Sequence, residues 1–557
     1  MIRNIKLGLA VTAMIMPFFV FSYALADTLG QSMVFSVNKD FDEFDRSTIS
    51  ATLRHVGENA YFYVDDDHWN GLNFNARQEF LSDIRQLASE FDVNIYPTKT
   101  LFWGQEPKPG IDGDNRVIIL LEQLKSNNGG YFSTANGYSK KLVPESNERE
   151  MMVVGIDSTT GSYAKVFLAH EFQHLISFNQ KELLRSVNEE VWLNELRSEY
   201  SVTLVGYNGT FSGSSLEKRA KDFFNDPSNS ITEWPNVSLD YASVALLGEY
   251  IGEEYGRNFL RDTLYTSLTG ISSINSILNA NNAGENFVNV FSNWLVASYV
   301  NDELLDSKFG YARTALKDLE AMPQRITMIS SSDSDTFNYS LKPWQPYGHK
   351  FYINNALLND KVAKLSPFIQ PGFSFAYVDN LGRYSALGND FYVTDPGGLE
   401  YFFVFPINSS KTSGFSSSES ESVMSLTLSF ENRAESIDFG SALKDGVLIK
   451  KQNEKEIYVI EGKYKRYLRS EIIALYGHLD AAKAMEVDEV TFHSYTTANY
   501  VRYVGGEEVY AVWPDGTKHW LNITPKQWDD SGRDWGAIFI INDLELNAYK
   551  TGANIVR

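Results

Sequence analysis

The stretch "LAHEFQHLIS", Leu168–Ser177, contains two histidines, His170 and His174, with Glu171 directly after the first. With 8 histidines in 557 residues, a chance His-Glu-x-x-His is expected on the order of once in a hundred such chains. The surrounding segment, Ser162–Phe178, has no glycine or proline and predicts a helix. Positions four apart lie on one face of a helix. The motif therefore predicts two imidazoles directed at one metal ion.

Zinc suits this arrangement, because imidazole nitrogens bind Zn²⁺ at ~2.0–2.1 Å in tetrahedral sites. Glu171 lies on the same helix but is not needed as a ligand. We expect it to act as the general base on a water that zinc activates. The predicted cofactor is one catalytic Zn²⁺ ion.

A catalytic zinc needs a third protein ligand and one open position. The segment "VWLNELRSEYSVTL", Val191–Leu204, predicts a second helix that carries Glu195 and Glu199 on one face. Glu195 is the predicted third ligand. Glu199 is expected to accept the second N–H of a ligand histidine, and Asn194 to help orient the same group.

Three other glutamates lie between the two motifs. The alternative is that they form a solvated face, as charged side chains usually do. The sequence favours this solvated interpretation for Glu182, Glu189 and Glu190.

The combination of HExxH and "NELRSE" resembles the gluzincin metallopeptidases, the thermolysin-like clan. The clan pattern, HExxH and then Asn-Glu-x-x-x-Asp, is matched at His170, Glu171, His174, Asn194 and Glu195. It is not matched at the last position, where Glu199 replaces aspartate. The segments "GGYFSTANGY", "SNEREMMVV" and "AHEFQHLISFNQK" are similar to the hyicolysin-type secreted bacterial peptidases, a likeness that extends over residues 33–330. The resemblance implies a zinc endopeptidase without implying a particular substrate.

Peptide hydrolysis also requires a group that stabilises the oxyanion. In the clan that this chain resembles, a downstream histidine or tyrosine serves this purpose, and no histidine lies between His174 and His349. Tyr241, in a segment that predicts a helix over Leu239–Gly256, is the first candidate, and a core tyrosine is the equal alternative. Tyr200 and Arg197 are weaker candidates.

The length of 557 residues predicts three or four domains of roughly 150 residues each. The expected fold class is multidomain α+β. A zincin-like domain with a mixed sheet and active-site helices is expected over residues 27–330, followed by a linker at Met328–Ser340. A small β-rich, sandwich-like domain is expected over residues 341–435, with the serine-rich stretch Ser409–Ser422 as an exposed loop.

The last segment, residues 446–557, contains an internal repeat. Val447–Leu468 aligns with Tyr500–Leu521, and Tyr458 corresponds to Tyr510. Two copies of one αβ unit, each of about 50 residues, are the simplest explanation. Outside the HExxH region the sequence indicates no second metal site. His478, His493 and His519 are scattered along the chain. The "GIDGDN" segment, with Asp112 and Asp114, is more typical of a plain turn than of a cation site. A structural Ca²⁺ is therefore possible but has no support in the sequence.

The N-terminus resembles a secretory signal. Arg3 and Lys6 precede an apolar run over Leu7–Phe21, and the Ala24-Leu25-Ala26 site predicts cleavage after Ala26. The alternative, a membrane anchor, is disfavoured because the run is short and ends at small residues. Few residues separate Ala26 from the catalytic region, so we expect signal cleavage and zinc to suffice for activity.

The composition narrows the functions further. The chain has no cysteine, which excludes cysteine-ligated metals and cysteine nucleophiles. Its net charge of −22 disfavours nucleic acid and anionic lipid as partners. The leading hypothesis is a secreted zinc endopeptidase acting on proteins or peptides. The alternatives are a catalytically inactive cell-surface adhesion protein on a zincin scaffold, and an aminopeptidase of the same clan. The sequence does not indicate the oligomeric state, and residues 341–557 are compatible with substrate docking, wall attachment or a spacer.

Overall fold

The computed structural model describes residues 26–126, 128–156, 162–281, 284–303, 305–329, 333–353, 358, 361–388, 390–393, 396–432, 443–452, 454–531 and 533–555. The expected signal peptide lies outside these residues, except for Ala26. The chain divides into two compact units. The first contains the described residues up to Leu101 and Gln105–Ile176, and the second contains Phe102–Gly104 and the residues from Ser177 onward.

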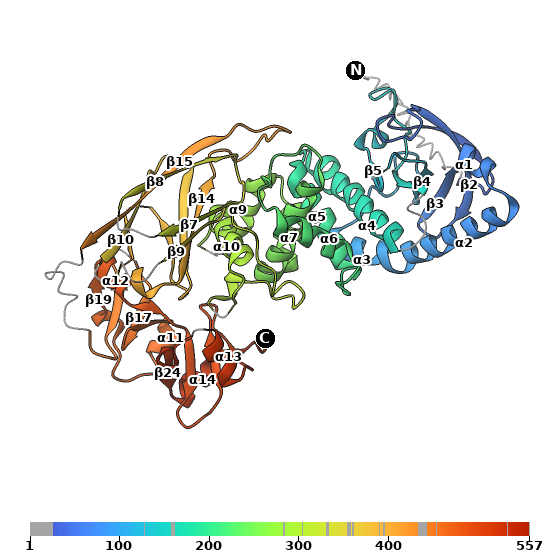
Figure 1. Ribbon diagram of the computed structural model, residues 1–557. Coiled ribbons are helices and arrows are strands. Elements are labelled where there is room, and N and C mark those ends of the chain that lie inside the picture. Colours follow the sequence, from blue (N-terminus) through green and yellow to red (C-terminus); the bar gives the residue numbers. More distant parts are fainter. Residues whose placement is uncertain are drawn as a thin grey trace, which may run out of the picture. The chain divides into compact units, whose positions relative to one another are not determined.

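The first unit is built on a six-stranded mixed sheet with the strand order β1-β2-β3-β4-β6-β5 (Figure 1). β3, β4 and β6 are parallel neighbours, and the short strand β5 is antiparallel to β6 at the edge. Buried parallel strands are apolar along their whole length, which explains "VIILLE" in β4. The bounds are β1 Ser32–Ser36, β2 Thr48–Val56, β3 Ala60–Asp65, β4 Val117–Glu122, β5 Gly130–Phe132 and β6 Met151–Gly155.

Helices of the first unit bury apolar side chains at helical spacing. Asn73 caps α2, whose buried side chains include Phe80, Ile84 and Leu87. A π-helical turn then leads into α3, and the HExxH segment forms α4. The bounds are α1 Asp66–Gly71, α2 Phe74–Glu90, the π-helical turn Phe91–Ile95, α3 Tyr96–Trp103 and α4 Ser162–Ser177.

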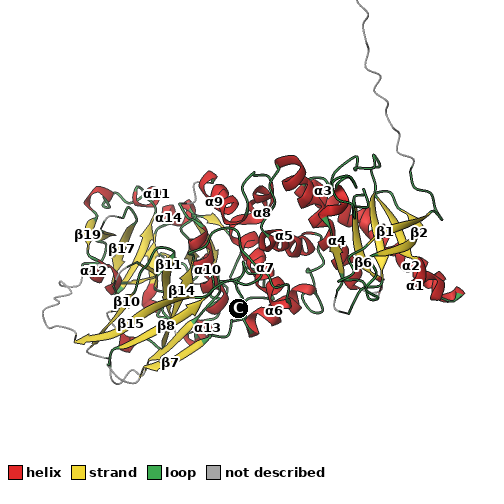
Figure 2. Ribbon diagram, turned by 90° about the horizontal axis from the view of Figure 1, so that it is seen from above, coloured by secondary structure: helices red, strands yellow, loops and turns green. Residues whose placement is uncertain are grey.

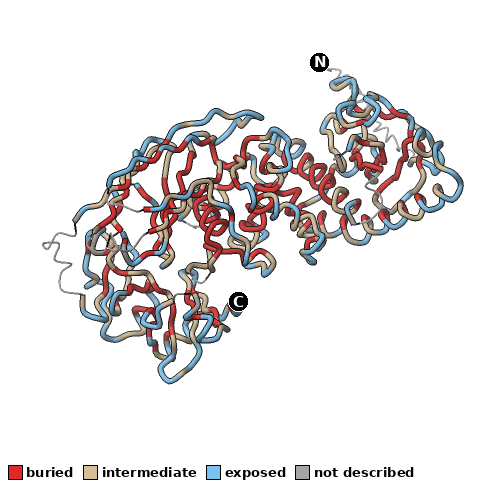
Figure 3. Tube along the Cα trace, viewed as in Figure 1, coloured by how far each residue is buried: buried red, intermediate tan, exposed pale blue. Residues whose placement is uncertain are grey.

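The second unit begins with a helical region, as the sequence predicted. Helix α5 coincides with the predicted segment, and α7 and α10 are buried on nearly every face (Figure 3). The elements are the π-helical turn Phe178–Leu183, α5 Val191–Leu204, α6 Ser215–Asn225, α7 Ser238–Ile251, the π-helical turn Gly252–Gly256, α8 Arg257–Leu264, α9 Gly270–Ala280 and α10 Phe287–Tyr299. Within the described part of the chain, every helix is too short or too polar to cross a bilayer.

After α10 the described chain is mostly β-strands, with short helices between some of them (Figure 2). Two sheets, β13-β10-β15-β8 and β12-β11-β14-β9-β7, enclose one apolar core, the arrangement of a β-sandwich. The bounds are β7 Arg325–Ile329, β8 Asp335–Leu341, β9 His349–Ile353, β10 Lys361–Pro367, β11 Phe373–Asp379, β12 Tyr384–Leu387, β13 Phe391–Val393, β14 Tyr401–Asn408 and β15 Ser422–Asn432.

The linker expected at Met328–Ser340 is a wrong prediction. This stretch contains the end of β7 and most of β8. In β8 the buried side chains Phe337, Tyr339 and Leu341 alternate with exposed polar ones. The serine- and aspartate-rich residues before Thr336 give the stretch the composition of a loop, which outweighed the two-residue alternation of a half-buried strand in the prediction.

The C-terminal repeats fold into two sheets of the same topology, β19-β16-β17-β18-β20 and β24-β21-β22-β23-β25. Tyr458 lies in β17 and Tyr510 at the equivalent place in β22. One apolar cluster includes residues of both copies. The strands are β16 Leu448–Lys451, β17 Ile457–Glu461, β18 Tyr464–Leu468, β19 Met485–Val487 and β20 Thr496–Thr497, and then β21 Tyr500–Tyr503, β22 Val509–Val512, β23 Thr517–Trp520, β24 Ile538–Ile541 and β25 Lys550–Thr551. The short helices are α11 Ser470–Ile473 and α12 Glu489–Ser494 in the first copy, and α13 Pro525–Asp530 and α14 Asp543–Ala548 in the second.

A buried ion pair joins the two copies. The carboxylate of Glu545, in the second copy, accepts hydrogen bonds from Arg466 and Tyr476 of the first and from Tyr549 of its own. None of these groups contacts the proposed metal site, so the pair serves the packing of the repeats.

Candidate metal centre

Helix α4 brings the two histidines of HExxH together. His170 and His174 lie one turn apart, and their Nε2 atoms are 3.2 Å from each other. Both side chains are largely buried. The helix that the apolar spacing predicted is therefore confirmed, together with the shared direction of the two imidazoles.

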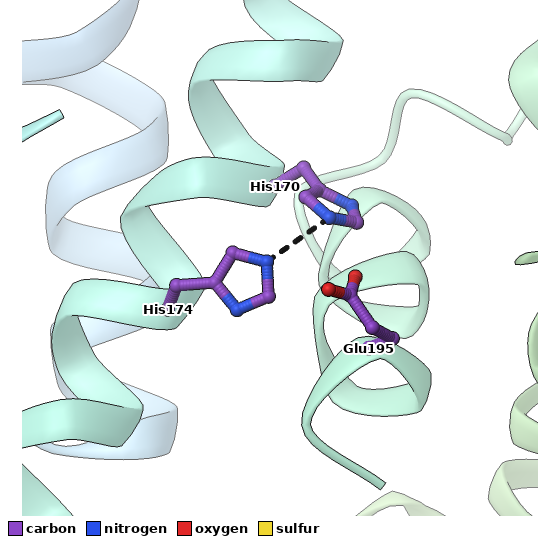
Figure 4. A group of neighbouring side chains, drawn as sticks. All are labelled: His170, His174 and Glu195. Carbon is purple, nitrogen blue, oxygen red and sulfur yellow. Dashed lines mark hydrogen bonds between the residues drawn. The ribbon is translucent and has the colours of Figure 1, made fainter. Parts of the chain in front are cut away.

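The third predicted ligand, Glu195 of α5, faces both imidazole rings (Figure 4). One ligand atom from each of His170, His174 and Glu195 lies within 4.8 Å of the other two. Ligand atoms of a tetrahedral zinc are about 3.4 Å apart when each bond is ~2.0–2.1 Å long. The spacing and the donor set of two imidazoles and one carboxylate fit Zn²⁺ with small adjustments. Among the described residues this is the one group of three or more histidines and carboxylates so arranged.

Glu171 is 6% exposed, and edge strand β5 lies directly beside it. A Cβ atom at Gly130 would be 3.1 Å from Cγ of Glu171 and 2.7 Å from the carbonyl oxygen of Val153. A Cβ at Gly129 would be 2.1 Å from the ring of Phe167. The two adjacent glycines are required for this close approach, because any side chain there would displace Glu171 or Phe167.

A buried lysine lies against the same helix. Nζ of Lys99, in α3, donates a hydrogen bond to the carbonyl oxygen of Ala169, the residue before His170. Burial lowers the pKa of Lys99 well below its usual range, and the negative charge of Glu171 acts in the opposite direction. Sequence reasoning missed Lys99, because nothing in the local pattern "YPTKTLFW" distinguishes it from a surface lysine.

Glu199 has an ionic partner that the sequence did not indicate. Its two carboxylate oxygens accept hydrogen bonds from Nε and Nη2 of Arg219, in α6, at 3.1 and 2.9 Å. The same guanidinium lies over the ring of Tyr241 at 4.9 Å. The hydroxyl of Tyr241 donates to Oδ1 of Asn236 at 2.7 Å. Two predicted site residues, Glu199 and Tyr241, are thus connected through Arg219.

The remaining predicted site residues have separate environments. Oδ1 of Asn194 is buried and has no hydrogen-bond partner among the described residues. Tyr200 is buried against Gly252, and burial raises its pKa to about 12. Arg197 is fully buried and donates to Glu189 and Thr263. Arg197 is therefore part of the core of the second unit.

The solvated surface predicted for Glu189 is wrong. Its side chain is 4% exposed and pairs with Arg197 at 2.8 Å and Lys181 at 3.3 Å. It also accepts the backbone N–H of Gly270 at 2.7 Å. Burial alone would raise the pKa of Glu189, but the two cations outweigh it and the pKa is lowered. Glu189 therefore stabilises the chain just before α5, the helix that carries Glu195.

Replacing Glu189 with alanine is expected to destabilise the fold by about 3–5 kcal/mol, because it leaves Arg197 and Lys181 buried without their carboxylate. Denaturant unfolding of the full chain measures this change. Asn188→Ala, at the exposed neighbouring position, is the control and should stay within about 0.5 kcal/mol of wild type. A Glu189→Ala variant as stable as this control would contradict the assignment.

The "GIDGDN" segment forms the plain turn that the sequence favoured. Asp112 pairs with Arg149, and Asp114 accepts a hydrogen bond from the hydroxyl of Tyr61. Both carboxylates also cap backbone N–H groups two residues further along. Hydrogen bonds and an ion pair within the protein therefore satisfy the carboxylates of Asp112 and Asp114, which were the alternative cation ligands.

Comparison with known proteins supports a relationship to metalloproteases. The chain is 27% identical over 263 residues to "Neutral metalloprotease ShpI" of Staphylococcus hyicus, an alignment that covers 42% of this chain and 55% of the relative. The match thus spans little more than half of the relative's length. No family model matches the chain. A solved pre-peptidase C-terminal domain of a Bacillus anthracis collagenase aligns with 20% of the chain and with all of that domain, at 10% identity and a TM-score of 0.13, and supports no conclusion.

Proposed function

We propose that the protein is a zinc-dependent endopeptidase of the gluzincin type. The observation that carries the proposal is the convergence of His170, His174 and Glu195 within 4.8 Å, with Glu171 on the same helix as the histidines. The relationship to a neutral metalloprotease supports it. The mixed sheet with edge strand β5 beside Glu171 is consistent with a zincin-like domain.

His170, His174 and Glu195 would hold the ion, and each offers a donor that zinc prefers in catalytic sites. When bound, Zn²⁺ supplies a Lewis acid that polarises the scissile carbonyl and lowers the pKa of water. Glu199 and Asn194 lie one turn after and one residue before Glu195 on α5. We propose that Glu199 accepts the second N–H of a ligand histidine and that Asn194 helps orient the same group. The pair with Arg219 would hold the Glu199 carboxylate in place for this role.

Glu171 takes a proton from the attacking water and returns it to the leaving amine. β5 borders its side chain, because a Cβ atom at Gly130 would lie only 3.1 Å from Cγ of Glu171. We propose that this close contact restricts the carboxylate. A restricted carboxylate loses little entropy when the substrate binds, which favours proton transfer in a fixed direction.

Tyr241 is the proposed donor to the oxyanion. Its hydroxyl is bonded to Asn236 in this structure and must turn away from it to reach substrate. Asn236 has a left-handed backbone, with φ of 66°. Arg219 lies over the ring of Tyr241, and the ring of Trp234 packs edge-on against it with the ring centroids 5.2 Å apart, so both neighbours support the orientation of the Tyr241 ring.

We further propose that the enzyme acts outside the cell on proteins or peptides. The basic start, the apolar run and the Ala24-Leu25-Ala26 site of the sequence support export. The acidic net charge of −22 is compatible with a soluble extracellular enzyme and disfavours nucleic-acid substrates.

A casein or gelatin assay with and without a chelator tests the proposal. The mature chain is expected to cleave these substrates, to lose activity with chelator, and to regain it when zinc is returned. It should cleave N-blocked peptides as readily as free ones, whereas an aminopeptidase would require the free amine. A protein that binds one zinc per chain and cleaves none of these substrates would overturn the proposal in favour of a binding protein.

A further inference from the structure

The loop between β14 and β15 is held in one conformation by ionic and hydrogen-bond contacts. We name residues Lys411–Glu419 the serine loop. The carboxylate of Glu419 accepts two hydrogen bonds from Nζ of Lys411, at 2.7 and 2.9 Å, and others from the backbone N–H and hydroxyl of Ser416. The indole of Trp344 donates to the carbonyl of Lys411 at 2.7 Å. The loop thus has a fixed shape and is anchored to the β-sandwich, although its sequence suggested only an exposed low-complexity stretch.

One end of α5 is bound by this loop. The backbone N–H of Gly414 donates to Oε1 of Glu190 at 2.8 Å, across 224 positions of sequence. Glu190 is the N-cap residue of α5, five positions before Glu195, and its side chain makes no capping hydrogen bond to its own helix. Gly414 has φ of 67°, a conformation that favours glycine. The carboxylate of Glu190, at the start of the helix that carries Glu195, therefore binds the serine loop.

A second contact reaches the proposed oxyanion residue. The carbonyl of Ser416 accepts a hydrogen bond from the backbone N–H of Trp234 at 3.2 Å. The ring of Trp234 packs edge-on against Tyr241. Neighbouring residues attach the same segment to the sandwich, because Glu233 pairs with Lys342 and Ser230 donates to the carbonyl of Pro343.

We propose that the serine loop is a positioning element of the metal site, through which the β-sandwich holds the start of α5 and the Trp234–Tyr241 pair. A helix moves as a rigid body over one or two turns, so a shift at Glu190 is transmitted to Glu195. Misplacement by about 1 Å is enough to lower catalysis by about 100-fold. The predicted effect on metal binding does not depend on catalysis, whereas the predicted effect on kcat rests on the proposed function.

Four variants of the full chain test the inference. Glu190→Ala removes the acceptor, Glu419→Ala releases the loop, Glu190→Gln retains an oxygen for Gly414, and Ser417→Ala changes an exposed loop residue that makes none of these contacts. Cobalt(II) is the probe, because its visible absorption reports the geometry of the metal ligands. If Glu419→Ala does not fold, Gly414→Ala replaces it, since a Cβ there meets no atom within 4 Å and strains only the backbone.

Glu190→Ala and Glu419→Ala are each expected to weaken cobalt binding by about tenfold, the range seen when groups that orient metal ligands are removed. Both should alter the cobalt spectrum and lower kcat, with KM within twofold of wild type. Glu190→Gln should recover most of the loss, and Ser417→Ala should match wild type. The Glu190→Ala, Glu419→Ala double variant should bind cobalt no more weakly than the more affected single variant, because the loop reaches the ligand-bearing helix through Glu190.

Unchanged cobalt affinity and spectrum in both alanine variants would overturn the inference and leave the sandwich as a spacer. Strictly additive losses of cobalt affinity in the double variant would also overturn it. A wild-type chain that binds cobalt but hydrolyses no peptide would refute the proposed function, while the cobalt measurements would still decide the role of the loop.

Discussion

Glu171→Gln is expected to lower kcat/KM by about 10³-fold or more while one zinc per chain is retained. Glutamine has the same size as glutamate and fits the space beside Gly130, so the fold and the ligands are undisturbed. It cannot take a proton from water, and general acid–base catalysis by one group contributes about 10²–10⁴-fold. The measurement is steady-state hydrolysis of a blocked peptide together with metal analysis of the same preparation.

The matched control is Tyr163→Phe, on the same helix but 47% exposed, which should retain wild-type kinetics and zinc content. Hydrolysis by Glu171→Gln at a tenth of the wild-type rate would remove Glu171 from the role of base. Loss of zinc in this variant would instead assign Glu171 to metal binding.

His174→Ala and Glu195→Ala are each expected to weaken zinc binding more than 100-fold. This loss is larger than the roughly 10–100-fold that follows when a group that only orients a ligand is removed. Each leaves two of the three donors that converge within 4.8 Å. Activity should fall below detection at micromolar zinc. Competition with a chromophoric chelator measures the affinity directly.

Stability provides an independent measurement of the same site. Zinc at 100 times its dissociation constant stabilises a folded protein by about 2.7 kcal/mol, because the ion binds the folded chain alone. Wild type and the exposed control Asn188→Ala should both gain this stability on adding zinc. His174→Ala and Glu195→Ala should gain at most about 0.4 kcal/mol at the same zinc concentration, because their affinity is at least 100-fold lower. An equal gain in Glu195→Ala would show that another residue completes the site.

Local patterns predicted a large part of the fold. Segments with a helical pattern located α4, α5 and α7. These signals are local because a helix or strand repeats over a few residues. The prediction failed at β8, where aspartate and threonine before Phe337, and the asparagine and serine that alternate with the buried residues, suggested a linker.

Residues distant in sequence account for what the sequence did not predict. Glu189 is charged and adjacent to Glu190, so its local pattern predicted a solvated face, yet Arg197, Lys181 and Gly270 surround it. Lys99 contacts Ala169 across 70 positions, and Arg219 contacts Glu199 across 20. No periodic signal marks such pairs, because they depend on which helices pack together.

The sequence by itself therefore determined the identity and order of the candidate zinc donors. His170, Glu171 and His174 lie on one helix, where the spacing sets their direction. The tertiary structure alone decided that Glu195 meets them, that β5 confines Glu171, and that the serine loop binds the start of α5. The physical reason is distance along the chain: hydrogen-bond geometry over one turn is encoded locally, whereas contacts across 224 positions exist only once the whole second unit has packed.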